Sequence, residues 1–254
     1  MAADAVGSDH VSESAIAAPR ARLIDRLGMR WFLRFLSSSI GRKMVMGLTG
    51  LLLCGFVAAH LAGNLKLFVG AKAFNEYAHF LHSLEILPVA EAGLLLLFVA
   101  HVYLAFVTAA GNTAARLDDY SMKQSKQPRG LLVANPSTWM FASGAVVLGF
   151  IVLHLIDLKF ALRPDIRYLD EQDFAAPFAN TMAVLSNPVS RVCYVLGAIV
   201  LGFHLSHGFP SAFQSLGLNH PKYTPFIKIA GRLFGLAIAV GFASLALLIP
   251  NLQK

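Results

Sequence analysis

Five stretches of this chain lack Asp, Glu, Lys and Arg for long enough to cross a membrane, and this feature most constrains the fold. A helical span needs about 20 mainly apolar residues. The stretches lie between Lys43 and Lys66, Glu91 and Arg116, Arg129 and Asp157, Arg191 and Lys222, and Arg232 and Lys254. The chain is 14% charged, whereas soluble domains are nearer 25%. The sequence therefore predicts an all-α polytopic membrane protein.

We predict five transmembrane helices, at residues 44–67, 89–111, 138–158, 191–213 and 230–250. A sixth charge-free stretch, 174–190, is shorter and contains Pro177 and Pro188, so we expect part of an interfacial loop there. Three regions follow along the chain: a disordered tail at 1–19, an amphipathic helix at 20–37 and a membrane domain at 38–254.

The amphipathic helix is predicted from a four-residue period. Arg22, Arg26, Arg30 and Arg34 recur on one face, and Leu23, Leu27, Trp31 and Phe35 recur one position later. Such a helix lies on a membrane surface with its apolar face buried in lipid. Its role is either lipid anchoring or docking of a soluble partner.

The basic residues predict the orientation. With the N-terminus inside, 14 of the 21 Lys and Arg residues fall on the inner face and 7 on the outer face. Cytoplasmic segments beside spans carry such an excess, so we expect the N-terminus inside and the C-terminus outside. Basic flanks also account for the net charge of +7 without nucleic-acid binding. Cys54 and Cys193 lie on separate spans and form no CxxC, which excludes c-type haem attachment and a cysteine-ligated cluster.

Four histidines lie inside the first four predicted spans, one in each: His60, His101, His154 and His204. Ionisable residues within a membrane are costly and usually functional. A lone histidine in a span is equally consistent with a hydrogen bond to a neighbouring helix. Four together indicate haem, because a six-coordinate haem iron takes two axial imidazoles and bundles hold cofactors between facing helices. The sequence therefore predicts a five-helix bundle that encloses two b-type haems.

Depth in the membrane pairs these histidines. His60 and His154 lie roughly 5–9 Å from charged residues at the outer face, at 1.5 Å per helical residue. His101 and His204 lie roughly 15–20 Å from the same face. We therefore predict an outer pair, His60 with His154, and an inner pair, His101 with His204, about 10 Å apart along the membrane normal. His207 follows His204 by three residues, so spacing alone leaves either as the ligand.

The segment between the first two spans carries further polar residues: Tyr77, His79, His82 and Glu85. These residues either face water in an interfacial loop or form the proton-handling wall of a quinone site, because histidine titrates near neutral pH.

At these residues the chain resembles the five-helix, two-haem cytochrome b subunit that anchors succinate dehydrogenase and fumarate reductase (complex II). The resemblance covers roughly residues 38–250. It rests on HLAGNLKLF, AFNEYAHFLHSL, STWMF leading to VLHLID, and FHLSHGFPSAFQSLG. Members carry a histidine, a glycine four residues later and another nine residues after that, which His204, Gly208 and Gly217 match. The resemblance thus favours His204 over His207, and it implies the same pairing as depth.

The resemblance also implies the partners and the reaction. A flavoprotein with covalent FAD handles succinate or fumarate in the tricarboxylic acid cycle, and an iron–sulfur protein docks on the inner face. Electrons pass through the proximal haem (His101, His204) and the distal haem (His60, His154) to menaquinone, or ubiquinone, in the bacterial inner membrane. This chain would carry the quinone end of the reaction without succinate chemistry of its own. The whole complex could also form an oligomer.

Six basic residues are candidates for contacts with haem propionates or the iron–sulfur protein, although the inner-face charge excess explains each one equally well: Arg30, Arg34, Arg42, Lys43, Arg116 and Arg129. Some fumarate reductases have a glutamate two positions before the histidine of helix 4, linked to proton movement across the membrane. Gly202 occupies that position here, which argues against the same proton path.

Two other functions fit parts of the pattern. Dihaem cytochromes of hydrogenases, formate dehydrogenases and ascorbate-type reductases also use histidine pairs, but they would bring no covalent FAD. A transporter or non-redox scaffold would use the histidines to join helices and would be colourless.

Overall fold

The computed structural model describes residues 28–114, 136–170 and 172–252, and every regular element within these ranges is helical. Five helices are long and apolar enough to cross a membrane, which confirms the five predicted spans. They are α3 (Ser39–Asn64), α5 (Leu87–Ala114), α6 (Pro136–His154), α8 (Pro188–Ser215) and α9 (Thr224–Leu252). Apolar segments in lipid become helices because a helix satisfies all its backbone hydrogen bonds internally.

Local sequence signals begin two of these helices. The Ser38 side chain accepts a hydrogen bond from the Gly41 backbone N–H at the start of α3. The Asn187 side chain accepts from two backbone N–H groups at the start of α8, where Pro188 is the first helical residue. Such caps satisfy the N–H groups that have no partner within the helix. They extend α3 and α8 beyond the charge-free stretches from which the spans were predicted.

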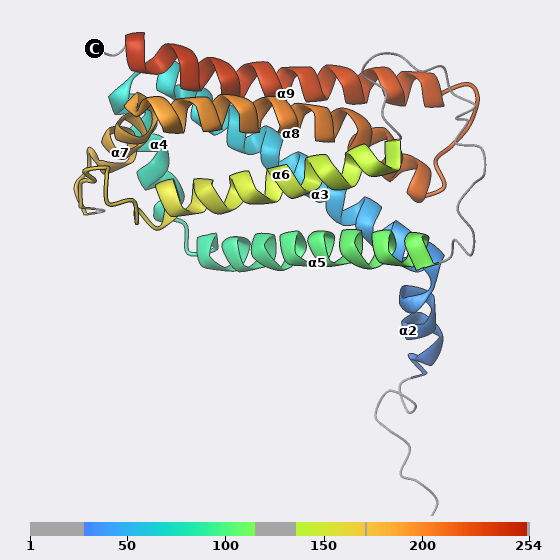
Figure 1. The fold of residues 1–254 in the computed structure, drawn as a ribbon. Coiled ribbons are helices and arrows are strands. Elements are labelled where there is room, and N and C mark those ends of the chain that lie inside the picture. Colours follow the sequence, from blue (N-terminus) through green and yellow to red (C-terminus); the bar gives the residue numbers. More distant parts are fainter. Residues whose placement is uncertain (1–27, 115–135, 171, 253–254) are drawn as a thin grey trace, which may run out of the picture.

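The five long helices run side by side as a bundle with two different ends (Figure 1). Two shorter helices, α4 (Ala71–His82) and α7 (Ala176–Ser186), pack on each other at one end, which we name the capped end. A further helix, α2 (Arg30–Ser37), leaves the opposite end, which we name the α2 end. Helix α9 finishes at the capped end, so α2 and the last turn of α9 lie at opposite ends of the bundle.

Helix α9 packs most closely against α8. A Cβ atom at Gly202 would lie 2.5 Å from the Gly235 carbonyl oxygen, so the two backbones touch at these glycines. Small residues allow this close approach between membrane helices, where van der Waals contact replaces the hydrophobic effect as the driving force. Around the contact, Leu205 and Ile238 form a small apolar core with Cys54 of α3.

At the capped end, two segments that were predicted to be loops form helices instead. The segment 174–190 forms α7 and the first residues of α8, because its two prolines occupy helix starts, where a missing N–H removes no helical bond. The segment that carries His79 forms α4. The Asn75 side chain joins the two short helices by accepting a hydrogen bond from the Phe178 backbone N–H at 2.9 Å.

Helix α2 covers the second half of the predicted amphipathic helix, while the tail and residues 20–27 lie outside the described residues. None of its residues is buried by the rest of the chain, and Trp31 is 71% exposed. The structure therefore leaves its apolar side chains uncovered, and its membrane contact stays a prediction.

Candidate functional site

His60 and His154 lie together near the capped end. The two ring centroids are 5.8 Å apart, with the planes at 84°. His60 lies near the end of α3, and His154 is the last residue of α6. Each ring has an aromatic neighbour one helical turn earlier, Phe56 for His60 and Phe150 for His154. We call these two histidines the capped-end pair.

His101 and His204 lie deeper, at about 21–24 Å along α5 and α8 from the capped end. Each ring points at a hydroxyl on a neighbouring helix. The His101 Nδ1 atom is 3.2 Å from Thr49 Oγ1 on α3, and the His204 Nδ1 atom is 3.1 Å from Ser143 Oγ on α6. We call His101 and His204 the central pair.

The contacts on α3 and α6 give the spacing between the two pairs. Thr49 precedes His60 by as many residues as Ser143 precedes His154, a rise of about 16 Å along either helix. The spacing predicted from the sequence was about 10 Å. The difference arises because the charged residues used as markers lie at unequal distances from the true helix ends, and one of them, Asp157, is buried.

The capped-end pair has the dimensions of a shared iron ligand set. With metal–imidazole bonds of about 2 Å, imidazoles on opposite sides of one iron have ring centres about 6 Å apart. The structure places these two at 5.8 Å. The Asn64 side-chain amide lies 3.5 Å from His60 Nε2, but its hydrogen bond goes to the His60 carbonyl at 2.8 Å. A contact of 3.5 Å is at the long limit of a hydrogen bond and is weak, so it competes little with a metal for the ring nitrogen.

Two glycines near the capped-end pair are exposed, and a Cβ atom at Gly55 of α3 or at Gly149 of α6 would meet no heavy atom within 4 Å. The helices that carry paired histidines, α3 with α6 and α5 with α8, are also not among the closely packed pairs of described helices. The histidines that would hold a haem thus come from helices that do not pack closely on each other, as in bundles that hold cofactors between facing helices.

His207 differs from His204 in orientation. It is exposed, and its Nδ1 atom lies near Ser206 Oγ at 3.1 Å and the Phe203 carbonyl at 3.2 Å, both on its own helix. His204 instead reaches Ser143 on α6. The structure thus turns His204 toward another helix and His207 away, which spacing could not distinguish.

The four residues predicted for a quinone site are spread along α4 and the turn after it. Tyr77 packs on Gly63 and lies under the Lys66 ammonium, 5.4 Å from the ring centroid. His79 stacks on Phe174 with centroids 4.6 Å apart, and its Nε2 lies 3.2 Å from the Phe174 carbonyl oxygen. These contacts give Tyr77 and His79 structural roles. His82 and Glu85 are exposed.

Sequence reasoning missed a polar cluster beside the capped-end pair. Asp157 served only as a boundary marker, but its side chain is fully buried and 3.5 Å from the Arg163 guanidinium. The Tyr194 ring lies 5.9 Å from the His154 ring, and among the described residues neither its buried hydroxyl nor that of Tyr168 makes a hydrogen bond of ordinary geometry. Asp157 lies in a π-helical turn, Leu155–Lys159. Such turns are rare and are frequently found at functional sites.

Arg163 also holds the segment after α6 in place. It forms an ion pair with Asp165 and donates to Ser190 Oγ at 2.6 Å. The hydrogen bond from Arg163 lowers the pKa of the Asp165 carboxyl below its ordinary value. Burial raises the pKa of the nearby Tyr168 hydroxyl. The network therefore keeps Arg163 and Asp165 charged and Tyr168 neutral at neutral pH.

At the α2 end, four of the six candidate basic residues are described. Arg30 and Arg34 belong to α2, while Arg42 and Lys43 belong to the first turn of α3. The Arg42 Nε–H donates to the Ser38 carbonyl at 3.4 Å. Arg116 and Arg129 lie outside the described residues.

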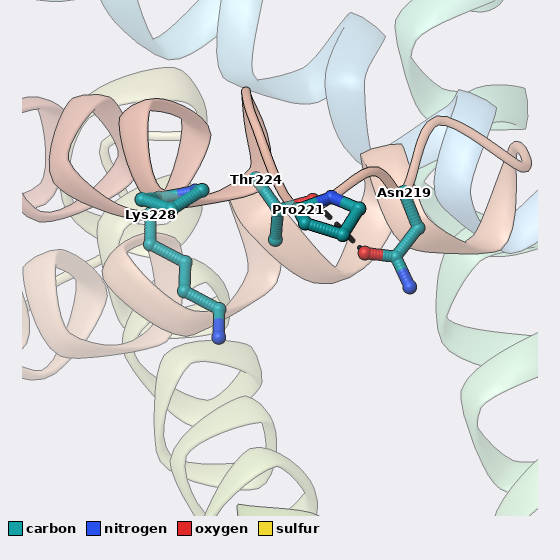
Figure 2. A pocket seen from close by; sticks show the side chains of 5 residues that line it. Asn219, Pro221, Thr224 and Lys228 are labelled. Atoms are coloured by element: carbon teal, nitrogen blue, oxygen red, sulfur yellow. Dashed lines mark hydrogen bonds between the residues drawn. The ribbon is translucent and has the colours of Figure 1, made fainter.

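The turn between α8 and α9 contains an open hollow of about 420 Å³, shown in Figure 2. Thr224 Oγ1 donates to Asn219 Oδ1 at 2.9 Å and accepts from the His220 backbone N–H. These bonds stabilise the start of α9, so the polar groups of the hollow are largely used in the turn. Lys228 extends along its edge.

Within the described ranges, no three His, Cys, Asp or Glu side chains gather as a metal cluster, whereas an axial haem site requires only two. Comparisons with protein-family models, curated proteins and solved structures find no match for this chain.

Proposed function

We propose that this chain binds two b-type haems and is the membrane-anchor, electron-transfer subunit of a succinate:quinone oxidoreductase. One observation carries the proposal: four histidines from four membrane helices form two pairs at different depths, with the capped-end pair at 5.8 Å between ring centroids. Imidazole pairs between helices are the usual axial ligands of six-coordinate haem. The family resemblance of the sequence adds the assignment to complex II.

In this proposal, each residue has a limited task. His60 and His154 hold the outer haem, and His101 and His204 hold the inner haem. Bound in this way, the haems accept and donate single electrons, which gives a path across the bilayer. The apolar helices around them exclude water, and a dry, apolar surrounding influences the potential of a haem.

The two ends of the bundle have different proposed partners. The α2 end faces the cytoplasm and receives the iron–sulfur subunit, with Arg30, Arg34 and Lys43 as candidate contacts. The capped end faces outward and takes the quinone, menaquinone or ubiquinone. Because Tyr77 and His79 have structural contacts, His82 and Glu85 are the better candidates for the quinone headgroup. Succinate and fumarate react in the flavoprotein.

The close packing of Gly202 argues against a transmembrane proton path that uses a glutamate at this position. Gly202 is buried against α9, where a Cβ atom would lie 2.6 Å from the Ala239 Cβ. A glutamate at this position would displace α9. The proposed subunit therefore lacks a transmembrane proton path through this position.

Purification of the intact complex in mild detergent tests the proposal. We expect a reduced-minus-oxidised spectrum with a b-type α band, two haems per chain, and co-purified iron–sulfur and covalent FAD subunits. A colourless protein would exclude haem binding and favour the transporter alternative. Two haems without covalent flavin would favour a cytochrome of a hydrogenase or formate dehydrogenase.

A further inference from the structure

Helices α3 and α6 repeat one sequence pattern at identical spacing. The pattern is a hydroxyl residue and glycine, four residues, glycine and phenylalanine, three residues, and histidine. It reads TGLLLCGFVAAH from Thr49 to His60 and SGAVVLGFIVLH from Ser143 to His154. The repeat ends on the two histidines of the capped-end pair. Its first half begins about 16 Å away along the helix, at the depth of the central pair.

The hydroxyl residue of each repeat contacts one histidine of the central pair. Each hydroxyl donates its proton to the backbone carbonyl three residues earlier on its own helix, at 3.0 Å for Thr49 and 3.2 Å for Ser143. With its proton used in this way, each hydroxyl oxygen is left as an acceptor for the imidazole Nδ1–H of His101, 3.2 Å away, or of His204, 3.1 Å away. A neutral imidazole that donates through Nδ1 has an unprotonated Nε2, which is the form that ligates a metal.

The first glycine of each repeat packs against the imidazole ring that the hydroxyl of that repeat contacts. A Cβ atom at Gly50 would lie 3.2 Å from His101 Cε1, and one at Gly144 would lie 3.3 Å from His204 Cε1. These distances are tighter than ordinary van der Waals contact, so a larger residue would push the ring. Hydroxyl and glycine together fix both the tautomer and the position of each ring.

We propose that Thr49 and Ser143 are positioning residues for the inner haem, which they hold through the Nδ1–H groups of His101 and His204. This inference rests on the proposed haem function. Outer-shell acceptors of this kind orient a ligating histidine and raise its basicity. A more basic ligand favours the oxidised iron, so both hydroxyls keep the midpoint potential of the inner haem low. No hydroxyl contact is described for His60 or His154, so the effect is confined to one haem.

The test is a redox titration of each haem in the purified complex, with Thr49→Val and Ser143→Ala as the altered variants. We expect the midpoint potential of the inner haem to rise in each, and the outer haem to titrate as in the wild type. Thr49→Ser keeps the hydroxyl and should titrate as the wild type. Ser206→Ala is the matched control, because Ser206 lies on α8 beside the exposed His207.

The outcomes separate this inference from the proposed function. A wild-type complex without haem would overturn both. Two bound haems with an unshifted inner potential in Thr49→Val and Ser143→Ala would overturn the inference alone. The inference is also overturned if Thr49→Ser raises the midpoint potential of the inner haem as much as Thr49→Val does. An equal rise in Ser206→Ala would overturn it as well. Loss of the inner haem alone from Thr49→Val, with Thr49→Ser intact, would support the positioning role.

Discussion

At the scale of single residues, the four membrane histidines divide into two environments. The central pair contacts hydroxyls of neighbouring helices through Nδ1. The capped-end pair contacts aromatic rings and lies close to the buried Asp157. Hydrogen bonds, burial and nearby charge are the factors by which a protein sets haem potential. Two unequal environments are therefore expected to give two haems of unequal potential.

Replacement of one capped-end histidine should remove one haem selectively. In His154→Ala, we expect loss of the outer haem and retention of the inner haem, because the inner ligands lie about 16 Å further along the helices. The haem content per chain and the reduced-minus-oxidised spectrum measure this. His207→Ala is the control and should keep both haems. Loss of the inner haem from His154→Ala would refute the pairing.

The exposed residues at the capped end should affect quinone use without affecting haem content. In the double variant His82→Ala with Glu85→Gln, we expect a several-fold higher KM for the quinone in the intact complex, with unchanged spectra. Glu76→Gln is the control, because Glu76 lies on the same helix and contacts Lys72 only through an exposed ion pair. An unchanged KM in the double variant would place the quinone elsewhere.

The proximity of His60 and His154, whose ring centroids are 5.8 Å apart, agrees with a count of residues along helices of known rise. The contacts of Thr49 and Ser143 could not be predicted, because they depend on how each helix is rotated toward its neighbour. The repeat from Thr49 to His60 and from Ser143 to His154 was the available signal. Asp157 was misjudged because a charged residue at the end of an apolar run was expected to face water, whereas its side chain is buried beside Arg163.

At the scale of elements, the contact between α8 and α9 rests on glycines. Gly235→Ala would place a Cβ atom against the Gly202 carbonyl, a backbone atom that cannot move aside. We expect a loss of about 1–3 kcal/mol in stability, the usual effect of overpacking. Thermal unfolding in detergent measures it. Gly93→Ala meets nothing within 4 Å and should be neutral or stabilising. Equal effects of both variants would contradict this packing.

The segment after α6 should depend on Arg163. In Arg163→Ala, the buried Asp157 carboxylate loses its charged partner, so we expect stability to fall by about 1–3 kcal/mol. Arg167→Ala is the control, since Arg167 is exposed in the same segment. Thermal unfolding of both variants measures the difference, and equal unfolding temperatures would argue against a structural Arg163–Asp157 pair.

The pH dependence of the same segment has a defined sign. The folded-state pKa of Asp165 is lowered by Arg163, so this ion pair contributes stability above the ordinary pKa of an aspartate. The contribution is lost as the pH falls through the lowered pKa. The wild type should therefore lose more stability in acid than Arg163→Ala does.

The existence of the five long helices could be predicted because lipid admits no other structure for such apolar runs. The short helices α4 and α7 could not, because they are held by contacts between distant segments, such as the bond from the Phe178 N–H to Asn75. The starts of α3 and α9 were predicted too late in the sequence, because they were taken from the charge-free stretches alone. The helices begin at caps and turns that lie outside these stretches.

At the scale of the whole molecule, the orientation in the membrane decides which histidine pair lies nearer the cytoplasmic partner in the proposed electron path. The count of Lys and Arg along the sequence, 14 on the side of the N-terminus against 7 on the other, predicts that the α2 end is cytoplasmic. The central pair would then lie nearer the cytoplasm than the capped-end pair. Electrons from a cytoplasmic iron–sulfur subunit would reach His101 and His204 first.

Topology reporters fused to the two ends of the bundle test this orientation. Alkaline phosphatase is active only outside the cytoplasm. Green fluorescent protein fluoresces when it stays in the cytoplasm but not when it is exported in unfolded form. We expect active phosphatase after Leu252, at the capped end, and fluorescence after Leu218, in the turn at the α2 end. The reverse result would place the capped-end pair on the cytoplasmic side. The iron–sulfur subunit would then have to dock at α4 and α7 rather than beside Arg30, Arg34 and Lys43.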